Sequence, residues 1–196
     1  QLNKITPYNL GAYLPWQGPF SGSYMEVLPE YETLSLTGDA AGRPMIRGME
    51  AEDAHRVYFF AVWPNQLLSL HPDYLMLHWL TPLAPDRTIV RCEWYFDPAE
   101  MAKETFDPSD AIDFWDLTNR QDWHVCELQQ RGTKSRAYTA GRYSAIESGV
   151  QTFDLMVADR YADDGIATPA TRIAKQESSA AIKARAKAAA RGEAAD

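Results

Sequence analysis

Short runs of alternating apolar and polar residues dominate the middle of the chain. They are rich in β-branched and aromatic residues and are separated by turns containing proline and aspartate, which is the pattern of an antiparallel meander. Strands are predicted over residues 55–63, 66–70, 74–81 and 88–96. Alternation in the third run places Leu75, Leu77 and Trp79 on one face of the sheet. Because large apolar groups occur on both faces, we expect a curved sheet with a pocket or a helix on its inner side.

The segment before this meander is rich in turn-forming residues. Residues 1–30 combine prolines and glycines with interspersed aromatic side chains. This composition predicts an irregular but packed segment, because the aromatic rings need an interior. Residues 31–36 predict a further strand, which a turn-rich stretch over 38–44 follows.

The apolar positions change to a helical period after residue 106. Residues 107–110 (DPSD) form a helix start, and the helix is predicted to reach residue 131 and stop at Gly132. A second helix, over residues 144–161, opens with a capping box (SAIE). Its apolar stripe, expected to lie in the core, consists of Ile146, Val150, Phe153, Val157 and Tyr161. Strands followed by helices predict the α+β class.

Length and composition favour one sizeable domain. The chain has 196 residues, 45% of them hydrophobic, and a formal charge of −8. Residues 168–196 carry six Lys and Arg against three Asp and Glu, so this end is +3 and the rest is −11. The acidic body argues against nucleic acid as a partner, and no apolar run is long enough for a membrane helix. Cys92 and Cys126 predict two buried thiols in a reducing compartment, which favours the cytoplasm.

One face of the long predicted helix contains a residue that does not match its neighbours. That face reads Ile112, Trp115, Asn119, Asp122, Cys126 and Gln129. A carboxylate at Asp122, far from either helix end, predicts a partner, because an unpaired buried charge is costly. The partner is a hydrogen-bond donor, a cation, or one of Arg56, Arg91, Arg120 and Arg136. His124 faces the other side of the helix, and His71 with His78 lacks the usual spacing of a metal-ligand pair.

Several segments resemble the catalytic domain of Rieske-type non-haem iron ring-hydroxylating oxygenases, in the large (alpha) subunit. Residues 113–132 (DFWDLTNRQDWHVCELQQRG) are similar to the last helix of that domain, and residues 134–138 (KSRAY) are typical of the segment directly after that helix. Residues 63–65 (WPN) and 80–88 (LTPLAPDRT) resemble its meander. The resemblance extends over most of residues 1–161 and excludes the end of the chain.

The resemblance implies a metal ligand and a fold. The family holds mononuclear Fe(II) with two histidines and one aspartate, and Asp122 stands at the position of that aspartate. Such a site leaves positions open for O₂ beside the substrate. The implied helix-grip (START/Bet v 1-like) fold wraps a curved antiparallel sheet around a long C-terminal helix. Trp115, Asn119 and Cys126 share the face of Asp122 and are expected around the iron, whereas Glu127 points away.

The resemblance also implies that this chain is a part of a longer domain. In the family, the two iron histidines and the Cys and His ligands of a [2Fe–2S] cluster precede the region that residues 1–7 (QLNKITP) resemble. Residues 1–165 are therefore expected to be the C-terminal part of the catalytic domain, and alone inactive. Residues 166–196 are expected to be a disordered tail rich in Ala, Lys and Arg.

The implied activity is oxidation of a small molecule by O₂. Electrons come from NAD(P)H through a ferredoxin or reductase partner, and the product is hydroxylated or demethylated. Both aromatic catabolism and oxidation of quaternary ammonium compounds stay open, as do monooxygenation and dioxygenation. The full protein is expected to be a homotrimer or an alpha/beta oligomer. The alternatives are a non-catalytic helix-grip module that binds an apolar ligand, with Asp122 in a salt bridge, and a subunit that only assembles with others.

Overall fold

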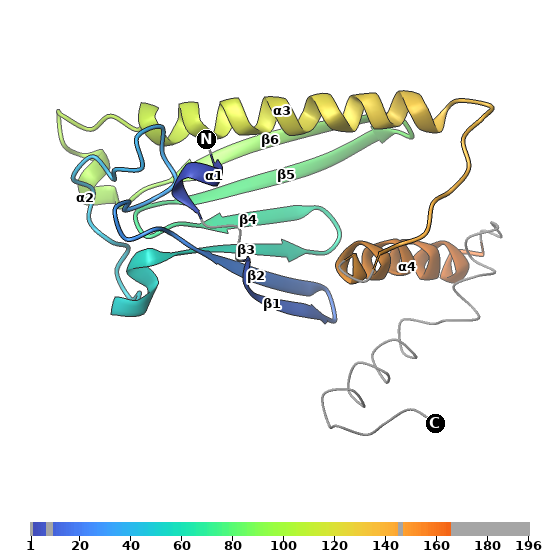
Figure 1. Cartoon of the computed structure of the whole chain (residues 1–196), viewed down its shortest axis with the longest axis horizontal. Helices are drawn as coiled ribbons and strands as arrows, with labels where there is room; N and C mark the ends of the chain where they lie inside the picture. The colour runs from blue at the N-terminus through green and yellow to red at the C-terminus, as the bar shows by residue number, and fades with distance from the viewer. Residues whose placement is uncertain (1, 7–9, 145–146, 166–196) are drawn as a thin grey trace, which may run out of the picture. The chain divides into compact units, whose positions relative to one another are not determined.

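The computed structural model describes residues 2–6, 10–144 and 147–165 (Figure 1). The chain divides into two compact units, Gln1–Thr139 and Ala140–Asp196. The expected boundary at residue 165 and the expected tail over 166–196 stay predictions, because residues 166–196 lie outside the described part.

In the first unit, the described strands form one antiparallel sheet whose strand order follows the chain (Figure 1). The strands are β1 (Leu10–Gln17), β2 (Phe20–Glu26), β3 (Arg56–Val62), β4 (Gln66–Leu70), β5 (Leu75–Ala84) and β6 (Arg87–Tyr95). Short helices flank them: α1 (Leu2–Ile5), η1 (Ala51–His55) and α2 (Pro98–Met101). The meander predicted from residue 55 onward is confirmed, and β4 has the predicted bounds.

The first thirty residues contain more regular structure than predicted. Residues 10–26 form the hairpin β1–β2, so the expected irregular segment is wrong. Gly18 joins the two strands with a φ of +64°, which glycine adopts easily. A Cβ atom on Gly22 would come within 2.8 Å of the Phe60 ring on β3. These glycines therefore serve the turn and the close packing of the sheet itself.

The strand predicted over residues 31–36 is also wrong, because this segment is a buried loop. Thr33, Leu34 and Ser35 are fully buried. The Tyr74 hydroxyl donates a hydrogen bond to the carbonyl of Leu34 at 2.6 Å. A side chain from the core thus supplies one of the hydrogen bonds to the loop backbone. In the predicted strand, a neighbouring strand would supply these hydrogen bonds.

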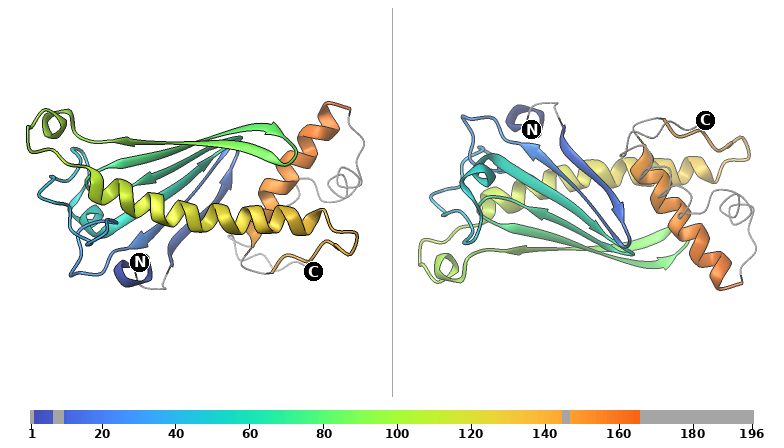
Figure 2. Two further views of the ribbon diagram at one scale, coloured as in Figure 1. Left: turned by 90° about the horizontal axis from the view of Figure 1, so that it is seen from above. Right: turned by 90° about the horizontal axis from the view of Figure 1, so that it is seen from below.

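The long helix α3 (Ser109–Thr133) crosses one face of the sheet (Figures 1 and 2). Its predicted bounds are correct within two residues, and the Asp107 carboxylate accepts a hydrogen bond from the Ser109 amide at 2.9 Å. The core lies under its first half, where Phe114 and Trp115 pack with Tyr74 and Met76. This arrangement is the predicted α+β class and is consistent with the helix-grip fold.

A buried ion triad fixes the beginning of α3 to the sheet. The Arg43 guanidinium donates to Asp73 at 2.9 Å and to both carboxylate oxygens of Asp110 at 2.8 and 2.7 Å. Exposed fractions of the three side chains are 4%, 1% and 19%. The guanidinium also lies 5.5 Å from the centre of the Phe96 ring. Because Asp110 is in the first turn of α3, this contact sets where the helix starts on the sheet.

The second unit contains helix α4 (Ser148–Asp163). Glu147 accepts a hydrogen bond from the Ser144 amide at 2.6 Å, which is half of the predicted capping box, but the helix begins four residues later than expected.

The predicted core stripe of α4 is wrong. Its buried residues are Leu155 and Ala158, whereas Val150, Phe153 and Tyr161 are exposed and Val157 is half-buried. Ile146 lies outside the described residues. A helical period alone cannot decide which face is covered when apolar residues occupy more than one.

Candidate active site

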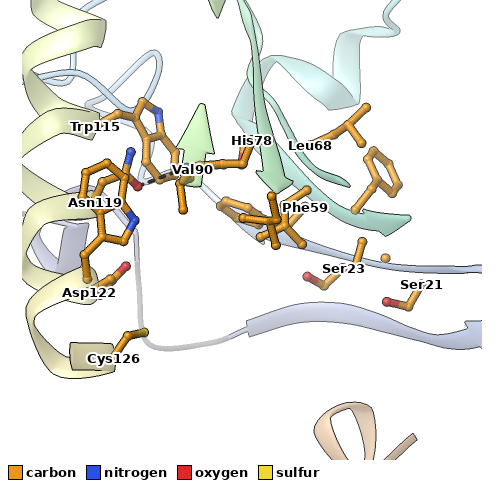
Figure 3. A pocket seen from close by; sticks show the side chains of 17 residues that line it. Ser21, Ser23, Phe59, Leu68, His78, Val90, Trp115, Asn119, Asp122 and Cys126 are labelled. Carbon is orange, nitrogen blue, oxygen red and sulfur yellow. Dashed lines mark hydrogen bonds between the residues drawn. The ribbon is translucent and has the colours of Figure 1, made fainter. Parts of the chain in front are cut away.

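A cavity of about 490 Å³ lies between α3 and the inner face of the sheet (Figure 3). The helix contributes Trp115, Asn119, Asp122, Trp123 and Cys126. The sheet contributes Ser21 and Ser23 on β2, Phe59 and Ala61 on β3, Ser69 on β4, His78 on β5 and Val90 on β6. In the register of the strands, Ser21 stands opposite Ala61, and Phe59 stands opposite Ser23 and Ser69. The four helix residues predicted from the resemblance, Trp115, Asn119, Asp122 and Cys126, are thus brought to one cavity.

The Asp122 carboxylate lies at the wall of this cavity, but it is exposed (Figure 3). The prediction that it is buried is wrong, because the core covers only the first half of α3. It forms no hydrogen bond or ion pair with any other described residue. Three of the arginines proposed as partners pair elsewhere: Arg56 with Glu52, Arg91 with Glu93, and Arg120 with Asp116. The structure therefore gives no support to a salt bridge at Asp122.

A polar pair lies in the cavity wall one helical turn before Asp122. The Nε2 atom of His78 and the Oδ1 atom of Asn119 are 3.2 Å apart, and the Asn119 amide donates to the Cys92 sulfur at 3.7 Å. Both His78 and Asn119 are buried. Burial lowers the pKa of His78 below its ordinary value, and its contact with Asn119 opposes this. Neutral His78 therefore links β5 to α3 beside the candidate ligand.

Trp115 closes the inner end of the cavity. Its indole N–H donates to the Tyr74 hydroxyl at 2.8 Å. Its ring meets His71 edge-on, with the ring centres 5.6 Å apart, and His78 in the same way at 6.3 Å. Burial lowers the pKa of His71 well below its ordinary value, so this side chain is neutral as well. Neither ring nitrogen of His71 has a hydrogen-bond partner among the described residues.

The two cysteines differ in their surroundings. Cys92 is half-buried, and burial raises the pKa of its thiol. Cys126 is exposed, so the prediction of two buried thiols is wrong for this residue. It lies one turn after Asp122, on the part of α3 that the core does not cover.

The donors around the cavity suit a metal only in part. Asp122 presents a carboxylate that no other described residue pairs with, and Fe(II) accepts such a group as a ligand. The described part of the chain holds no cluster of three or more His, Cys, Asp or Glu residues that could bind a metal ion. Asp122 thus fits one position of a mononuclear iron site. A [2Fe–2S] cluster does not fit, because Cys92 and Cys126 are the only cysteines in the sequence and occupy different environments.

An antiparallel sheet gripping a long helix, with a cavity between them, defines a protein of the helix-grip type. A sequence profile of the family described as "Ring hydroxylating alpha subunit (catalytic domain)" matches residues 2–163. The chain belongs to this family. The family resemblance predicted from the sequence is confirmed. Among the residues that the structure describes, no helix is both long and apolar enough to span a membrane.

Individual relatives are similar over parts of the chain. A chloroplastic choline monooxygenase of Arabidopsis thaliana is 26% identical over 152 residues, which are 75% of this chain and 36% of the relative. A glycine betaine monooxygenase oxygenase subunit of Chromohalobacter salexigens is 33% identical over 101 residues, which are 51% of this chain and 22% of the relative. A choline monooxygenase of Amaranthus tricolor is 24% identical over 132 residues, which are 67% of this chain and 29% of the relative. The chain therefore spans about a third or less of the length of these relatives.

Sequence reasoning missed most of the sheet side of the cavity. Ser21 and Ser23 belong to a hairpin that was predicted to be irregular, and the hydrogen bond between His78 and Asn119 was not foreseen. The available signal for His78 was its alternation with Met76 on β5 and with Tyr74 just before that strand, because these three residues share the buried face.

Proposed function

We propose that this chain is part of the catalytic domain of a Rieske non-haem iron oxygenase that oxidises a quaternary ammonium compound with O₂. The observation that carries the proposal is the Asp122 carboxylate, which has no partner among the described residues and lies at the wall of the cavity, in a chain that matches the catalytic domain of this family. Asp122 would hold Fe(II) together with ligands from outside the described residues. When bound, the iron supplies O₂ activation at positions that its protein ligands leave open.

The residues around Asp122 shape the space for substrate. The buried pair of His78 and Asn119 holds α3 against β5 one turn before the carboxylate, and Trp115 closes the inner end. Because these groups are buried or hydrogen-bonded, this part of the cavity wall is held in place. An ordered wall of this kind lowers the cost of orienting a small substrate beside the metal.

Two features favour a quaternary ammonium substrate over an aromatic one. Relatives named choline monooxygenase and glycine betaine monooxygenase match much of the chain. The cavity lining also contains the aromatic rings of Phe59, Trp115 and Trp123. Aromatic faces attract a trimethylammonium group, which has no hydrogen-bond donor of its own.

The remaining properties of the whole protein are part of the same proposal. We propose that the electrons come from NAD(P)H through a reductase or ferredoxin and a [2Fe–2S] cluster on another part of the protein. The proposed enzyme is a monooxygenase of the cytoplasm that assembles as a homotrimer or an alpha/beta oligomer, and the described unit alone does not turn over.

Turnover with matched substrates tests this function. The holoenzyme with its electron donor is supplied with choline, with glycine betaine, and with toluene as an uncharged aromatic control. We expect oxygen uptake and an oxidised product with at least one of the two ammonium compounds and none with toluene. Oxidation of toluene alone would contradict the substrate class. A metal-free protein that retains an apolar ligand in native mass spectrometry would favour the non-catalytic binding module.

A further inference from the structure

The cavity beside Asp122 has a neighbour with which it shares three lining residues. A second hollow of about 450 Å³ lies between the turn that joins β5 to β6 and the second half of α3. Val90, Trp123 and Cys126 line both this outer hollow and the cavity. The two spaces therefore border each other at these residues.

The two spaces differ in chemistry. The wall of the cavity is mainly apolar and aromatic, whereas the lining of the outer hollow combines apolar side chains with polar and charged groups. Those groups are Asp86, Arg87, Thr88, Glu127 and Gln130. Asp86 is paired with Lys134, the residue directly after α3. A hydrated, charged molecule can stay partly solvated in the outer hollow and lose its water on entering the cavity.

Burial along α3 shows which end of the cavity is closed. Trp115 and Asn119 are 7% and 5% exposed, and Met76 and Phe114 behind them are fully buried. Asp122 and Cys126, further along the same helical face, are exposed. The cavity therefore cannot open toward the start of α3 without unpacking the core, while its side toward the outer hollow is free of core packing.

We propose that Val90, Trp123 and Cys126 form a passage through which a quaternary ammonium substrate moves from the outer hollow to Asp122. This inference rests on the proposed function for the identity of the substrate. Trp123 gives the passage an aromatic face that a trimethylammonium group can cross. Cys126 gives it an accessible thiol, so its width can be changed chemically in the folded protein.

Thiol reagents of different size test the passage. N-Ethylmaleimide adds a large group to the Cys126 sulfur. Methyl methanethiosulfonate adds only a methylthio group, with methanesulfinate as the leaving group. In the holoenzyme, we expect maleimide treatment to lower kcat/KM for choline or glycine betaine roughly tenfold while the iron content stays constant. The methylthio adduct is expected to lower kcat/KM less, and dithiothreitol is expected to reverse its effect. Val90→Phe, which narrows the passage from β6, is expected to lower kcat/KM in the same direction.

Cys126→Ser is the matched control, since it removes the reacting sulfur. Each protein is compared with its own untreated sample, so that effects on Cys92 or on other thiols appear in the control. We expect treatment to leave kcat/KM of the Ser variant unchanged. Unchanged kcat/KM of the wild type, with complete alkylation of Cys126 shown by mass spectrometry, would overturn the passage. Loss of iron on alkylation would also overturn it, because Cys126 would then belong to the metal site.

The rate of iron release tests the passage independently of the proposed substrate class. If the holoenzyme binds iron but oxidises neither ammonium compound, the substrate class fails and the passage is measured without turnover. In that case 2,2′-bipyridine, a chelator with flat rings, is expected to remove iron more slowly after maleimide treatment of the wild type. The Ser variant is expected to release iron at one rate with and without treatment. Equal rates in the wild type would refute the passage.

Discussion

Replacement of Arg43 by methionine is the sharpest test of how α3 is held to the sheet. The substitution keeps much of the side-chain volume but leaves Asp73 without its cationic partner, and the Asp73 side chain is 1% exposed. Breaking a buried ion pair by removing one partner typically costs about 3–5 kcal/mol. Asp110 is 19% exposed and lies in the first turn of α3, where the helix dipole favours a negative charge. The loss of its contact with Arg43 therefore adds less to the cost of the substitution.

The free energy of unfolding of the full chain, measured with urea, checks this value. We expect Arg43→Met to lower it by about 3–5 kcal/mol, equivalent to roughly 6–20 °C in Tm. Arg120→Met is the matched control, because the pair of Arg120 with Asp116 is exposed at 71% and 49%. An exposed i,i+4 pair contributes little to stability, because water and salt screen it.

The pH dependence of the variant identifies Asp73 as the cause. Burial raises the pKa of Asp73, and Arg43 opposes this. Without Arg43 the native pKa rises further, so the cost is largest when the carboxyl is ionised and disappears as the pH falls and Asp73 takes up a proton. Asp73→Asn in the Arg43→Met background is expected to restore part of the loss at neutral pH. A loss no larger than that of Arg120→Met would refute the reasoning, as would a loss that stays constant with pH.

Other predictions concern the buried histidines and two glycines. Burial lowers the native pKa of His71 and His78 below 6.5. The contribution of these residues to stability is therefore complete above that pH, and it falls at lower pH because the unfolded state takes up protons there. His71→Phe is expected to reduce this loss of stability at acid pH in unfolding experiments, and His124→Gln, at an exposed residue, is the control. Gly22→Ala is expected to lower the free energy of unfolding by about 1–3 kcal/mol, because its Cβ atom would meet the Phe60 ring at 2.8 Å. Gly132→Ala, with no heavy atom within 4 Å of the added Cβ, is expected to raise it by about 0.5–1 kcal/mol. Equal effects of the two glycine changes would contradict the packing described.

The fold could be predicted where local signals agree with the tertiary structure. Residues 66–70 are bounded by turn residues on both sides, and the strand has those bounds. The hairpin β1–β2 was missed because its glycines are required by the turn and by the Phe60 ring of another strand, and neither need is visible in the local sequence. Residues 31–36 carry the composition of a strand, but their backbone groups bind the core and α3.

For the site, the sequence allowed us to predict which residues share one face of α3, but not how exposed they are or which residues lie opposite them. The 3.6-residue period correctly placed Trp115, Asn119, Asp122 and Cys126 together, because helix geometry is local. Exposure depends on how far the core extends under α3, and the buried residues of this helix all precede Asp122. For this reason Asp122 and Cys126 were wrongly expected to be buried. The residues that face them across the cavity depend on strand register, which one sequence does not specify.

Iron content tests the central proposal, that Asp122 is a metal ligand. Total iron per chain is measured in the purified holoenzyme for the wild type, for Asp122→Asn and for the control Asp116→Asn, whose carboxylate pairs with Arg120 on α3. We predict that Asp122→Asn lacks about one iron per chain relative to the wild type, since an amide replaces a charged ligand, while Asp116→Asn keeps it. Wild-type iron content in Asp122→Asn would contradict the assignment of Asp122 and the function proposed from it.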